Sequence, residues 1–262
     1  MNTSLAGLLH RVRKVPRLGG LSLTFLGLEL RRTLRNRSTI FFTLMMPPIF
    51  FLIFGTAAHY RTTTVGRGNA TAYILVSMAV YGAMLATTSG GAMVAVERAL
   101  GWSRQLALTP LRPLTYIALK MLVAMTLGLL AVLVVFAVGA GSGAQMDGIV
   151  WVESALMAWA GSAVFAAFGL FMGYLLPSEN LMQVLGPVLA LLAFAGGLFI
   201  PLSGGLFATV AAFTPAYGLA SIARAPLTGD GLTVRAAANL LIWCAIFTGG
   251  AAALFRRDTR RT

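Results

Sequence analysis

Six stretches of this 262-residue chain carry no charged side chain, and each is long enough to cross a lipid bilayer. A membrane-spanning helix needs roughly 20 mostly apolar residues, because the hydrocarbon core of a bilayer is about 30 Å thick. In lipid, helices satisfy every backbone polar group within one segment, whereas closed barrels are built from shorter alternating strands. The pattern therefore predicts an all-α integral membrane protein with six transmembrane helices. The charge-free stretches are 38–60, 68–96, 121–146, 154–178, 180–223 and 236–255.

We expect one transmembrane domain over residues 21–257, between a basic cytoplasmic tail of residues 1–20 and a short tail of residues 258–262. Residues 21–36 predict an amphipathic helix in the plane of the lipid headgroups, because leucines recur at helical spacing on one of its faces. The alternative for these residues is a frayed tail. The six spans are expected at about 38–58, 70–95, 115–139, 152–176, 181–200 and 235–255.

The charge-free stretch 180–223 is long enough for two spans. Two spans would bring the total to seven and place the basic C-terminus outside, against the tendency of Lys and Arg to remain in the cytoplasm. Prolines at positions 187, 201 and 215 also divide the stretch. We therefore predict one span followed by a partly re-entrant segment, about 203–222, on the extracellular side. Irregular backbone at membrane depth is tolerated where it is buried in protein or lines a cavity.

Most of the 20 Lys and Arg residues lie before the first span, beside the connection of spans 2 and 3, or after the last span. The other side of the membrane keeps Arg61, Arg67, Arg224 and Arg235. Because cytoplasmic loops are enriched in Lys and Arg, both termini are expected in the cytoplasm. The net charge of +13 then reflects topology and contact with anionic lipids, and we expect no nucleic-acid partner.

The charge-free stretches leave no Asp, Glu, Lys, Arg or His in the interior of a span, where ion-coupled transporters usually place such groups. The chain has no Gly-rich loop followed by Lys for ATP phosphates, since its only lysines are Lys14 and Lys120. No His or Cys cluster has metal-binding spacing, and no acid or His accompanies the membrane Ser and Thr residues to activate a nucleophile. We therefore expect no enzyme activity, metal or cofactor in this chain, and any uphill transport must draw on another subunit.

Residues 97–109 connect spans 2 and 3 and lie on the cytoplasmic side by the charge distribution. They combine apolar side chains such as Leu100 and Trp102 with the basic residues Arg98 and Arg104. A short element of this kind fits a groove on a protein partner. It equally fits the membrane interface, where arginines bind lipid phosphates and Trp lies at headgroup depth. The residues alone favour neither interpretation.

The same connection carries the pattern E-R-x-x-G-x-x-x-x-L-x-x-T-P-L-x-P, which runs from Glu97 to Pro113. It resembles the coupling region of the type-2 ABC exporter permeases, the transmembrane subunits of drug- and antibiotic-resistance pumps. The first span, Arg-Asn-Arg-Ser and then Met-Met-Pro-Pro-Ile-Phe-Phe-Leu-Ile-Phe-Gly55, resembles the first helix of that family. Gly197-Leu-Phe-Ile-Pro201 and Pro215-Ala-Tyr217 are similar to its fifth span and extracellular re-entrant helices. Gly204-Gly205 departs from the Leu-Pro-like turn of many members, which leaves the shape of this hairpin open.

The resemblance implies a half-transporter with an N-terminal amphipathic elbow helix, six spans, a cytoplasmic coupling helix over 97–109 and an extracellular re-entrant segment. It implies pairing with a second permease, either a copy of itself or a sister subunit. It also implies two copies of a cytoplasmic ABC ATPase that bind ATP and Mg, and export across a bacterial plasma membrane. The residues expected to couple to the ATPase are Glu97, Arg98, Gly101, Trp102, Arg104, Leu106, Thr109 and Pro110.

Spans 2 and 5 of such folds face the dimer axis, so the resemblance places the translocation path between them. An uncharged lining of aromatic, Met and hydroxyl groups suits an amphipathic drug, antibiotic or lipid-like cargo. The path residues, each of which ordinary packing or lipid contact would equally explain, are expected to be Tyr81, Thr87, Thr88, Gln183, Phe194 and Phe199. The residues expected to shape an extracellular gate are Pro201, Pro215 and Tyr217.

Two other classes of function remain open from the sequence. One is a channel or secondary transporter that needs no ATPase, and flux in liposomes holding this chain alone would identify it. The other is a membrane sensor or immunity protein that binds a ligand or partner without transporting it. An ABC ATPase gene beside the gene for this chain would favour export over both.

Overall fold

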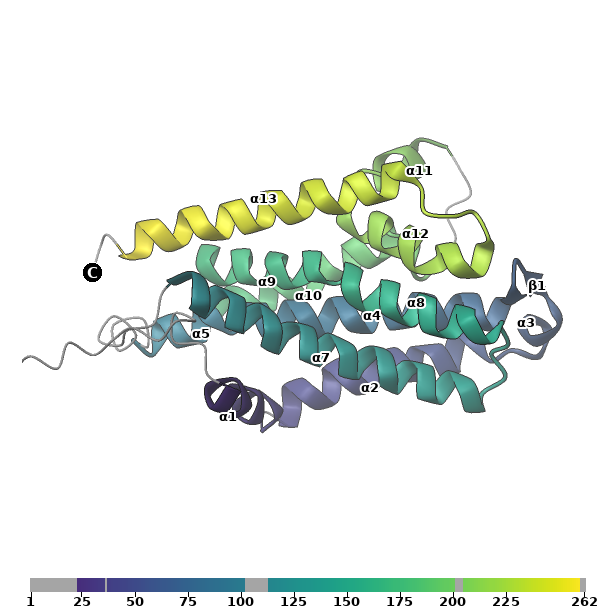
Figure 1. Cartoon of the computed structure of the whole chain (residues 1–262), viewed down its shortest axis with the longest axis horizontal. Helices are drawn as coiled ribbons and strands as arrows, with labels where there is room; N and C mark the ends of the chain where they lie inside the picture. Colours follow the sequence, from purple (N-terminus) through teal and green to yellow (C-terminus); the bar gives the residue numbers. More distant parts are fainter. Residues whose placement is uncertain (1–22, 36, 102–112, 201–204, 260–262) are drawn as a thin grey trace, which may run out of the picture.

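The computed structural model describes residues 23–35, 37–101, 113–200 and 205–259, and most of these residues are helical (Figure 1). Between α3 and α4, β1 (Thr64–Val65) and β2 (Gly68–Asn69) form a short antiparallel hairpin. Because each strand has only two residues and most described residues are helical, the all-α class predicted from the sequence is confirmed. The helices are α1 (Leu23–Leu34), α2 (Arg37–Gly55), α3 (Ala58–Thr62), α4 (Ala70–Ala92), α5 (Val94–Ala99), α7 (Pro113–Gly141), α8 (Gly148–Gly161), α9 (Ala163–Leu175), α10 (Ser178–Ala195), α11 (Gly205–Ala211), α12 (Pro215–Thr228) and α13 (Val234–Thr259).

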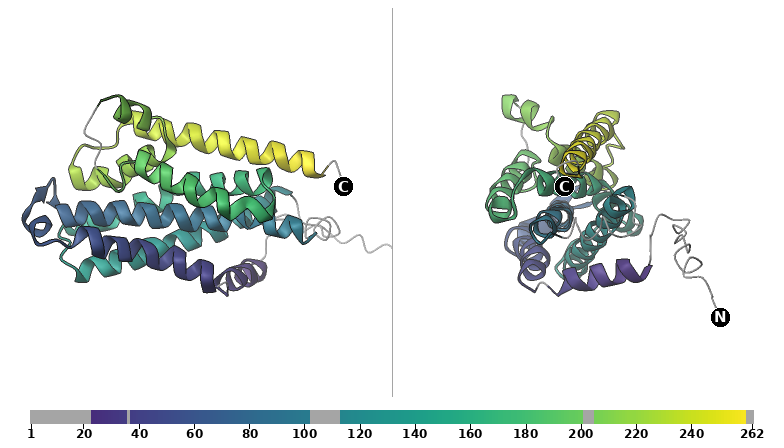
Figure 2. Two further views of the ribbon diagram at one scale, coloured as in Figure 1. Left: turned by 180° about the vertical axis from the view of Figure 1, so that it is seen from behind. Right: turned by 90° about the vertical axis from the view of Figure 1, so that its left-hand side faces the viewer.

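The long helices run side by side along one axis, so the molecule has two distinct ends (Figures 1 and 2). One end carries α1, α5 and the last turns of α13, and we call it the α5 end. The other carries α3, the β-hairpin, α11 and α12, and we call it the hairpin end. The first and last described helices therefore meet the same end of the bundle, as an even number of crossings requires.

Among the described residues, five helical stretches are long and apolar enough to cross a membrane. They are Ala70–Ala99, Thr115–Gly141, Gly148–Leu175, Ser178–Ala195 and Val234–Arg257. The helix of the first predicted span is a shorter apolar helix over Ile40–Gly55. The count of six spans thus depends on α2 and stays a prediction.

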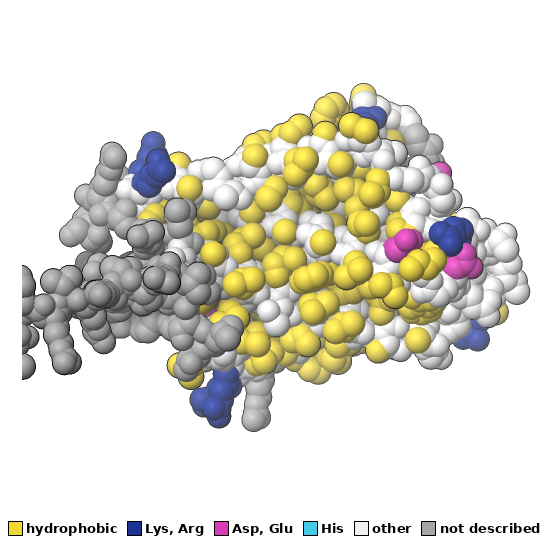
Figure 3. All heavy atoms as spheres, viewed as in Figure 1, with side chains coloured by type: hydrophobic (Ala, Val, Ile, Leu, Met, Phe, Trp, Pro, Cys, Tyr) yellow, Lys and Arg dark blue, Asp and Glu magenta, His cyan; other side chains and the backbone are white. Residues whose placement is uncertain are grey.

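Apolar side chains cover the middle of the surface in Figure 3, and most of the charged side chains in view lie toward its two ends. Exposed large apolar side chains occur on several long helices, for example Ile53, Leu133, Leu191 and Leu241. Soluble monomers rarely expose contiguous apolar patches of this kind. Together with the long apolar helices, this surface identifies a multi-pass membrane protein.

The central helix is α4, which packs against α2, α7 and α9 and contributes much of the buried core. Its contact with α9 is close because both helices present glycine there. A Cβ atom added at Gly169 would lie 2.2 Å from the carbonyl oxygen of Thr88, and one at Gly173 would lie 3.1 Å from that of Ala92. The Gly169-x-x-x-Gly173 spacing in the sequence predicts such a close helix approach, and the structure confirms it.

The segment after α10 differs from the sequence prediction at its end. The predicted re-entrant segment stops at residue 222, but α12 continues to Thr228 and ends at Gly229, which adopts a left-handed conformation with φ of 79°. Arg224 interrupts the apolar pattern without interrupting the helix, because its side chain is buried against α4 and residue 197. The helix begins where Thr214 accepts a hydrogen bond from the Tyr217 amide at 3.3 Å.

Candidate functional site

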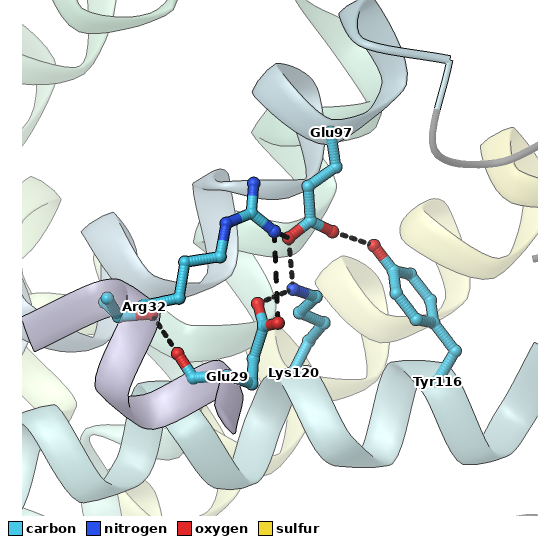
Figure 4. A network of polar contacts seen from close by, with 6 residues as sticks. Glu29, Arg32, Glu97, Tyr116 and Lys120 are labelled. Carbon is cyan, nitrogen blue, oxygen red and sulfur yellow. Dashed lines mark hydrogen bonds and ion pairs between the residues drawn. The ribbon is translucent and has the colours of Figure 1, made fainter. Parts of the chain in front are cut away.

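Five side chains from three helices meet at the α5 end and form what we call the ion network (Figure 4). Glu29 and Arg32 come from α1, Glu97 from α5, and Tyr116 and Lys120 from α7. The pairs on α1 and α7 are three and four residues apart, so each pair shares one helical face. The network therefore connects the predicted elbow helix, the start of the predicted coupling segment and the helix of the third predicted span, α7.

Lys120 is the centre of the ion network, since its ammonium group donates to the carboxylates of both Glu29 and Glu97. Arg32 also donates to Glu97 at 3.1 Å, and the Tyr116 hydroxyl donates to the second oxygen of the same carboxylate. Lys120 is 2% exposed and Glu97 is 1% exposed. Two carboxylates and two cations balance one another, as buried charges require.

The pKa of Glu29 lies below its ordinary value. Burial alone would raise this pKa, but the hydrogen bond and the positive charge of Lys120, helped by Arg32, outweigh the effect of burial. Glu29 is therefore held as a carboxylate, and α1 is held against α7 by a charged contact.

The predicted ATPase-coupling residues are placed differently from the sequence expectation. Glu97 is buried in the ion network, and Arg98 donates to the carbonyl oxygens of Gly173 and Tyr174 at 3.2 and 3.0 Å, near the end of α9. Both side chains are thus engaged within the chain, and their part in ATPase coupling stays a prediction. Gly101 follows α5 with φ of 72°. Trp102, Arg104, Leu106, Thr109 and Pro110 lie outside the described residues.

A cavity of about 940 Å³ lies among α2, α4 and α10, and we call it the aromatic cavity. Its wall is completed by Tyr60, Val65 and residues 197–200. Phe199 is the centre of its aromatic side chains, with ring centroids 5.1 Å from Tyr81 and 5.0 Å from Phe194. The lining residues carry no formal charge, and the polar groups that they offer are mainly hydroxyls of Tyr and Ser.

The structure brings together three of the six predicted path residues. Tyr81, Phe194 and Phe199 line the aromatic cavity, as their places on spans 2 and 5 predict. The remaining three do not line this cavity, and their place on a translocation path stays a prediction. Thr87 and Thr88 are 0% exposed, and their hydroxyls donate to the carbonyl oxygens of Ala83 on α4 and Phe165 on α9. Gln183 lies on the exposed surface of α10.

The predicted gate residues are found at the start of α12. Pro215 occupies the first turn of α12, where its missing N–H costs no helix bond, and Tyr217 follows it. Neither is among the residues that line the aromatic cavity. Pro201 lies outside the described residues. Their action as a gate stays a prediction.

Sequence reasoning missed Arg224, which it placed on the outer side of the membrane. In the structure this residue is 8% exposed and bonds to Ser77 on α4 and to the carbonyl of Gly197. A signal was present in the chain, since Ala216, Ala220 and Arg224 recur every four residues and share one helical face. Across the described residues, no group of His, Cys, Asp and Glu has an arrangement that holds a metal ion.

Comparison with known proteins places this architecture among transporters. Residues 23–227 match the family model described as ABC-2 type transporter. Over 219 residues the chain is 27% identical to YvfS of Bacillus subtilis (strain 168), a transport permease by name. The match covers 82% of this chain and 87% of YvfS. Both findings agree with the family that the sequence motifs resemble.

Proposed function

Because the chain belongs to the ABC-2 type transporter family, we propose that this permease is the transmembrane subunit of an ATP-driven exporter. Two copies of a separate cytoplasmic ATPase bind ATP and Mg, and a second permease, identical or a sister subunit, completes the path. The assembly lies in a bacterial plasma membrane. Six spans place both termini on the same side of the membrane, and the basic residues of the described α5 end favour the cytoplasmic side.

The ion network is the single observation that carries this proposal. It joins α5, whose last residues begin the predicted coupling segment, to α1 and to α7 through Glu97 and Lys120. A push from the ATPases on residues 97–109 therefore reaches three helices at once. Packed interfaces adopt discrete arrangements and do not deform continuously. Such behaviour suits a switch between inward-open and outward-open states.

The aromatic cavity supports the second part of the proposal, which concerns the cargo. Phe50, Tyr81, Phe194 and Phe199 provide a large apolar surface with a hydroxyl group. Ligand sites commonly combine such walls with a few placed polar groups. We assign this cavity to an amphipathic drug, antibiotic or lipid-like molecule on its way out of the cell.

Capture of the ATPase tests the proposed function. The chain is co-expressed with the ABC ATPase encoded nearest to its gene, and the ATPase retained on the purified permease is quantified for wild type, Trp102→Ala and Arg104→Ala. Each variant should retain several-fold less ATPase, since Trp and Arg side chains dominate many protein interfaces. Arg235→Ala at the opposite end is the matched control and should retain the wild-type amount. Undiminished capture by both coupling variants would contradict the docking site.

A further inference from the structure

Arg224 is a buried cation whose hydrogen-bond partners are all neutral. Its Nε donates to the Ser77 hydroxyl at 3.1 Å, and its Nη2 donates to the same hydroxyl at 2.6 Å and to the Gly197 carbonyl at 2.7 Å. The guanidinium lies 4.4 Å from the centre of the Tyr73 ring. Among the described residues, no carboxylate forms an ion pair with Arg224, and no hydrogen bond uses its Nη1.

A buried charge is normally paired, because removal of an ion from water is costly. Ser77 and Gly197 satisfy only some of the five N–H donors of the guanidinium and supply no negative charge. Among the described residues Arg224 therefore lacks a counter-ion. This distinguishes it from Lys120, whose charge the ion network balances.

The position of Arg224 links it to the aromatic cavity. All three of its partners, Tyr73, Ser77 and Gly197, line that cavity. Ser77 lies seven residues from the start of α4, which is about 10 Å along the helix axis. The guanidinium thus lies directly behind the cavity wall, against Tyr73 and Ser77 of the membrane-spanning stretch Ala70–Ala99. Cations at such positions in membrane proteins mark binding sites and pathways.

We propose that the aromatic cavity binds an amphipathic anion, with its apolar tail against the aromatic wall and its carboxylate, phosphate or sulfonate neutralised by Arg224. This inference rests on the proposed function and deepens it, since it names the charge of the cargo. The same chemistry is offered by the headgroup of an anionic membrane lipid and by a free amphipathic acid. Either source supplies a counter-ion, which Arg224 does not find among the described residues.

Matched ligands test the proposal on the full chain in nanodiscs of zwitterionic lipid, without ATPase or nucleotide. The probes are dodecanoic acid, dodecanamide and dodecylamine, each measured by displacement of a dansyl-labelled fatty acid, at a pH at which the acid is ionised. Wild type should bind the acid about tenfold or more tightly than the amide, the range of a charge-assisted hydrogen bond. Arg224→Gln should bring this ratio close to one without weakening the amide, and Arg224→Lys should keep much of it.

Arg235→Gln, which removes an exposed arginine of the same end, is the control and should keep the wild-type ratio. Equal binding of acid and amide by wild type, tighter binding of the amine, or a full acid preference in Arg224→Gln would overturn the proposal. Absence of binding by all three probes would also overturn it, as expected if a second copy of the chain fills the cavity. The wild-type ratio decides even if Arg224→Gln does not fold.

Nanodiscs that contain phosphatidylglycerol separate the two sources of the anion. If a lipid headgroup occupies the site, wild type should lose its preference for the added acid there. If the ligand is a free amphipathic acid, the preference should persist. The binding assay needs no ATPase, so failure of ATPase capture would remove the exporter proposal and leave the anion site standing, and the reverse outcome is equally distinguishable.

Discussion

At the residue scale, the buried pair of Glu97 and Lys120 is the charged contact whose disruption should cost the most stability. Each side chain is almost fully enclosed, and each has the other as its partner. Removal of one member of a buried pair leaves the other charge without compensation, which costs about 3–5 kcal/mol. We therefore expect Lys120→Met to lower the free energy of unfolding by about this amount, measured by denaturant unfolding of the purified protein in micelles.

The double variant Lys120→Met with Glu97→Gln restores charge balance and should recover part of the loss. The exposed residue Arg235 provides the control, since Arg235→Gln should change the free energy of unfolding by no more than about 0.5 kcal/mol. A Lys120→Met protein as stable as wild type would show that the network does not stabilise the fold. A double variant less stable than Lys120→Met would show that charge balance is not what matters there.

Some site residues follow from the sequence and others do not, for reasons visible in single side chains. Tyr81 and Phe194 line the aromatic cavity and were selected because the family resemblance places the translocation path between spans 2 and 5. Thr87 was selected on the same ground but does not line the cavity, and its hydroxyl bonds to a carbonyl of the preceding turn, as a Thr hydroxyl on a helix can. The contact of Glu29 with Lys120 joins residues 91 positions apart, and no local sequence pattern predicts a contact over that distance.

At the scale of elements, the contact of α4 with α9 depends on Gly169. In lipid, helices gain little from burying apolar surface against one another, so close backbone packing must hold them. Gly169→Ala would place a Cβ 2.2 Å from the Thr88 oxygen, so α4 and α9 must move apart. We expect the free energy of unfolding to fall by about 1–3 kcal/mol, as for other overpacked cores, measured in the same micelle assay.

The control for this contact is Gly249 on α13, where an added Cβ meets nothing within 4 Å. Gly249→Ala should be neutral or raise the free energy of unfolding by up to about 1 kcal/mol, because Ala is the better helix former. An equal response of the two glycines would mean that helix propensity, and not packing, sets the effect at Gly169. The two substitutions add the same atoms, so their difference isolates the helix contact.

The elements themselves were largely predictable, because a long apolar run in lipid has few alternatives to a helix. The residues at which the helices begin and end were harder to predict. The predicted span 152–176 did not anticipate the boundary between α8 and α9 at Ser162, where the hydroxyl donates to the carbonyl of Trp159 at 2.6 Å. The end of α12 was missed because Arg224 looked like a boundary, whereas Gly229 is the residue that ends the helix.

At the scale of the whole molecule, α4 and α5 connect the two sites. Tyr81 and Ser77 on α4 line the aromatic cavity, and Glu97 on α5 belongs to the ion network. These residues lie on one stretch, Ala70–Ala99, that crosses most of the bundle. If the proposed function holds, we expect a displacement of α5 to pass along this stretch to the cavity wall, from the predicted coupling segment to the proposed cargo site. Whether that route crosses the membrane depends on the arrangement of the spans around it.

The arrangement of spans rests on α2, whose 19 residues give a length of about 28 Å, close to the hydrocarbon thickness. If α2 crosses the membrane, Arg35 and Thr64 lie on opposite sides. In a Cys244→Ser background, Thr64→Cys should react with a membrane-impermeant maleimide in intact cells, and Arg35→Cys only after permeabilisation. Arg257→Cys, at the far end of α13, should behave like Arg35→Cys.

The alternatives give separate labelling patterns. An α2 that lies in the interface would leave positions 35 and 64 on one side, and the remaining five spans would then place position 257 on the opposite side from both. An inverted protein would exchange all three results and place the ion network outside the cell, beyond the reach of a cytoplasmic ATPase. The basic residues of the described α5 end, which include Arg31, Arg98 and Arg256, favour the six-span orientation because cytoplasmic loops retain positive charge.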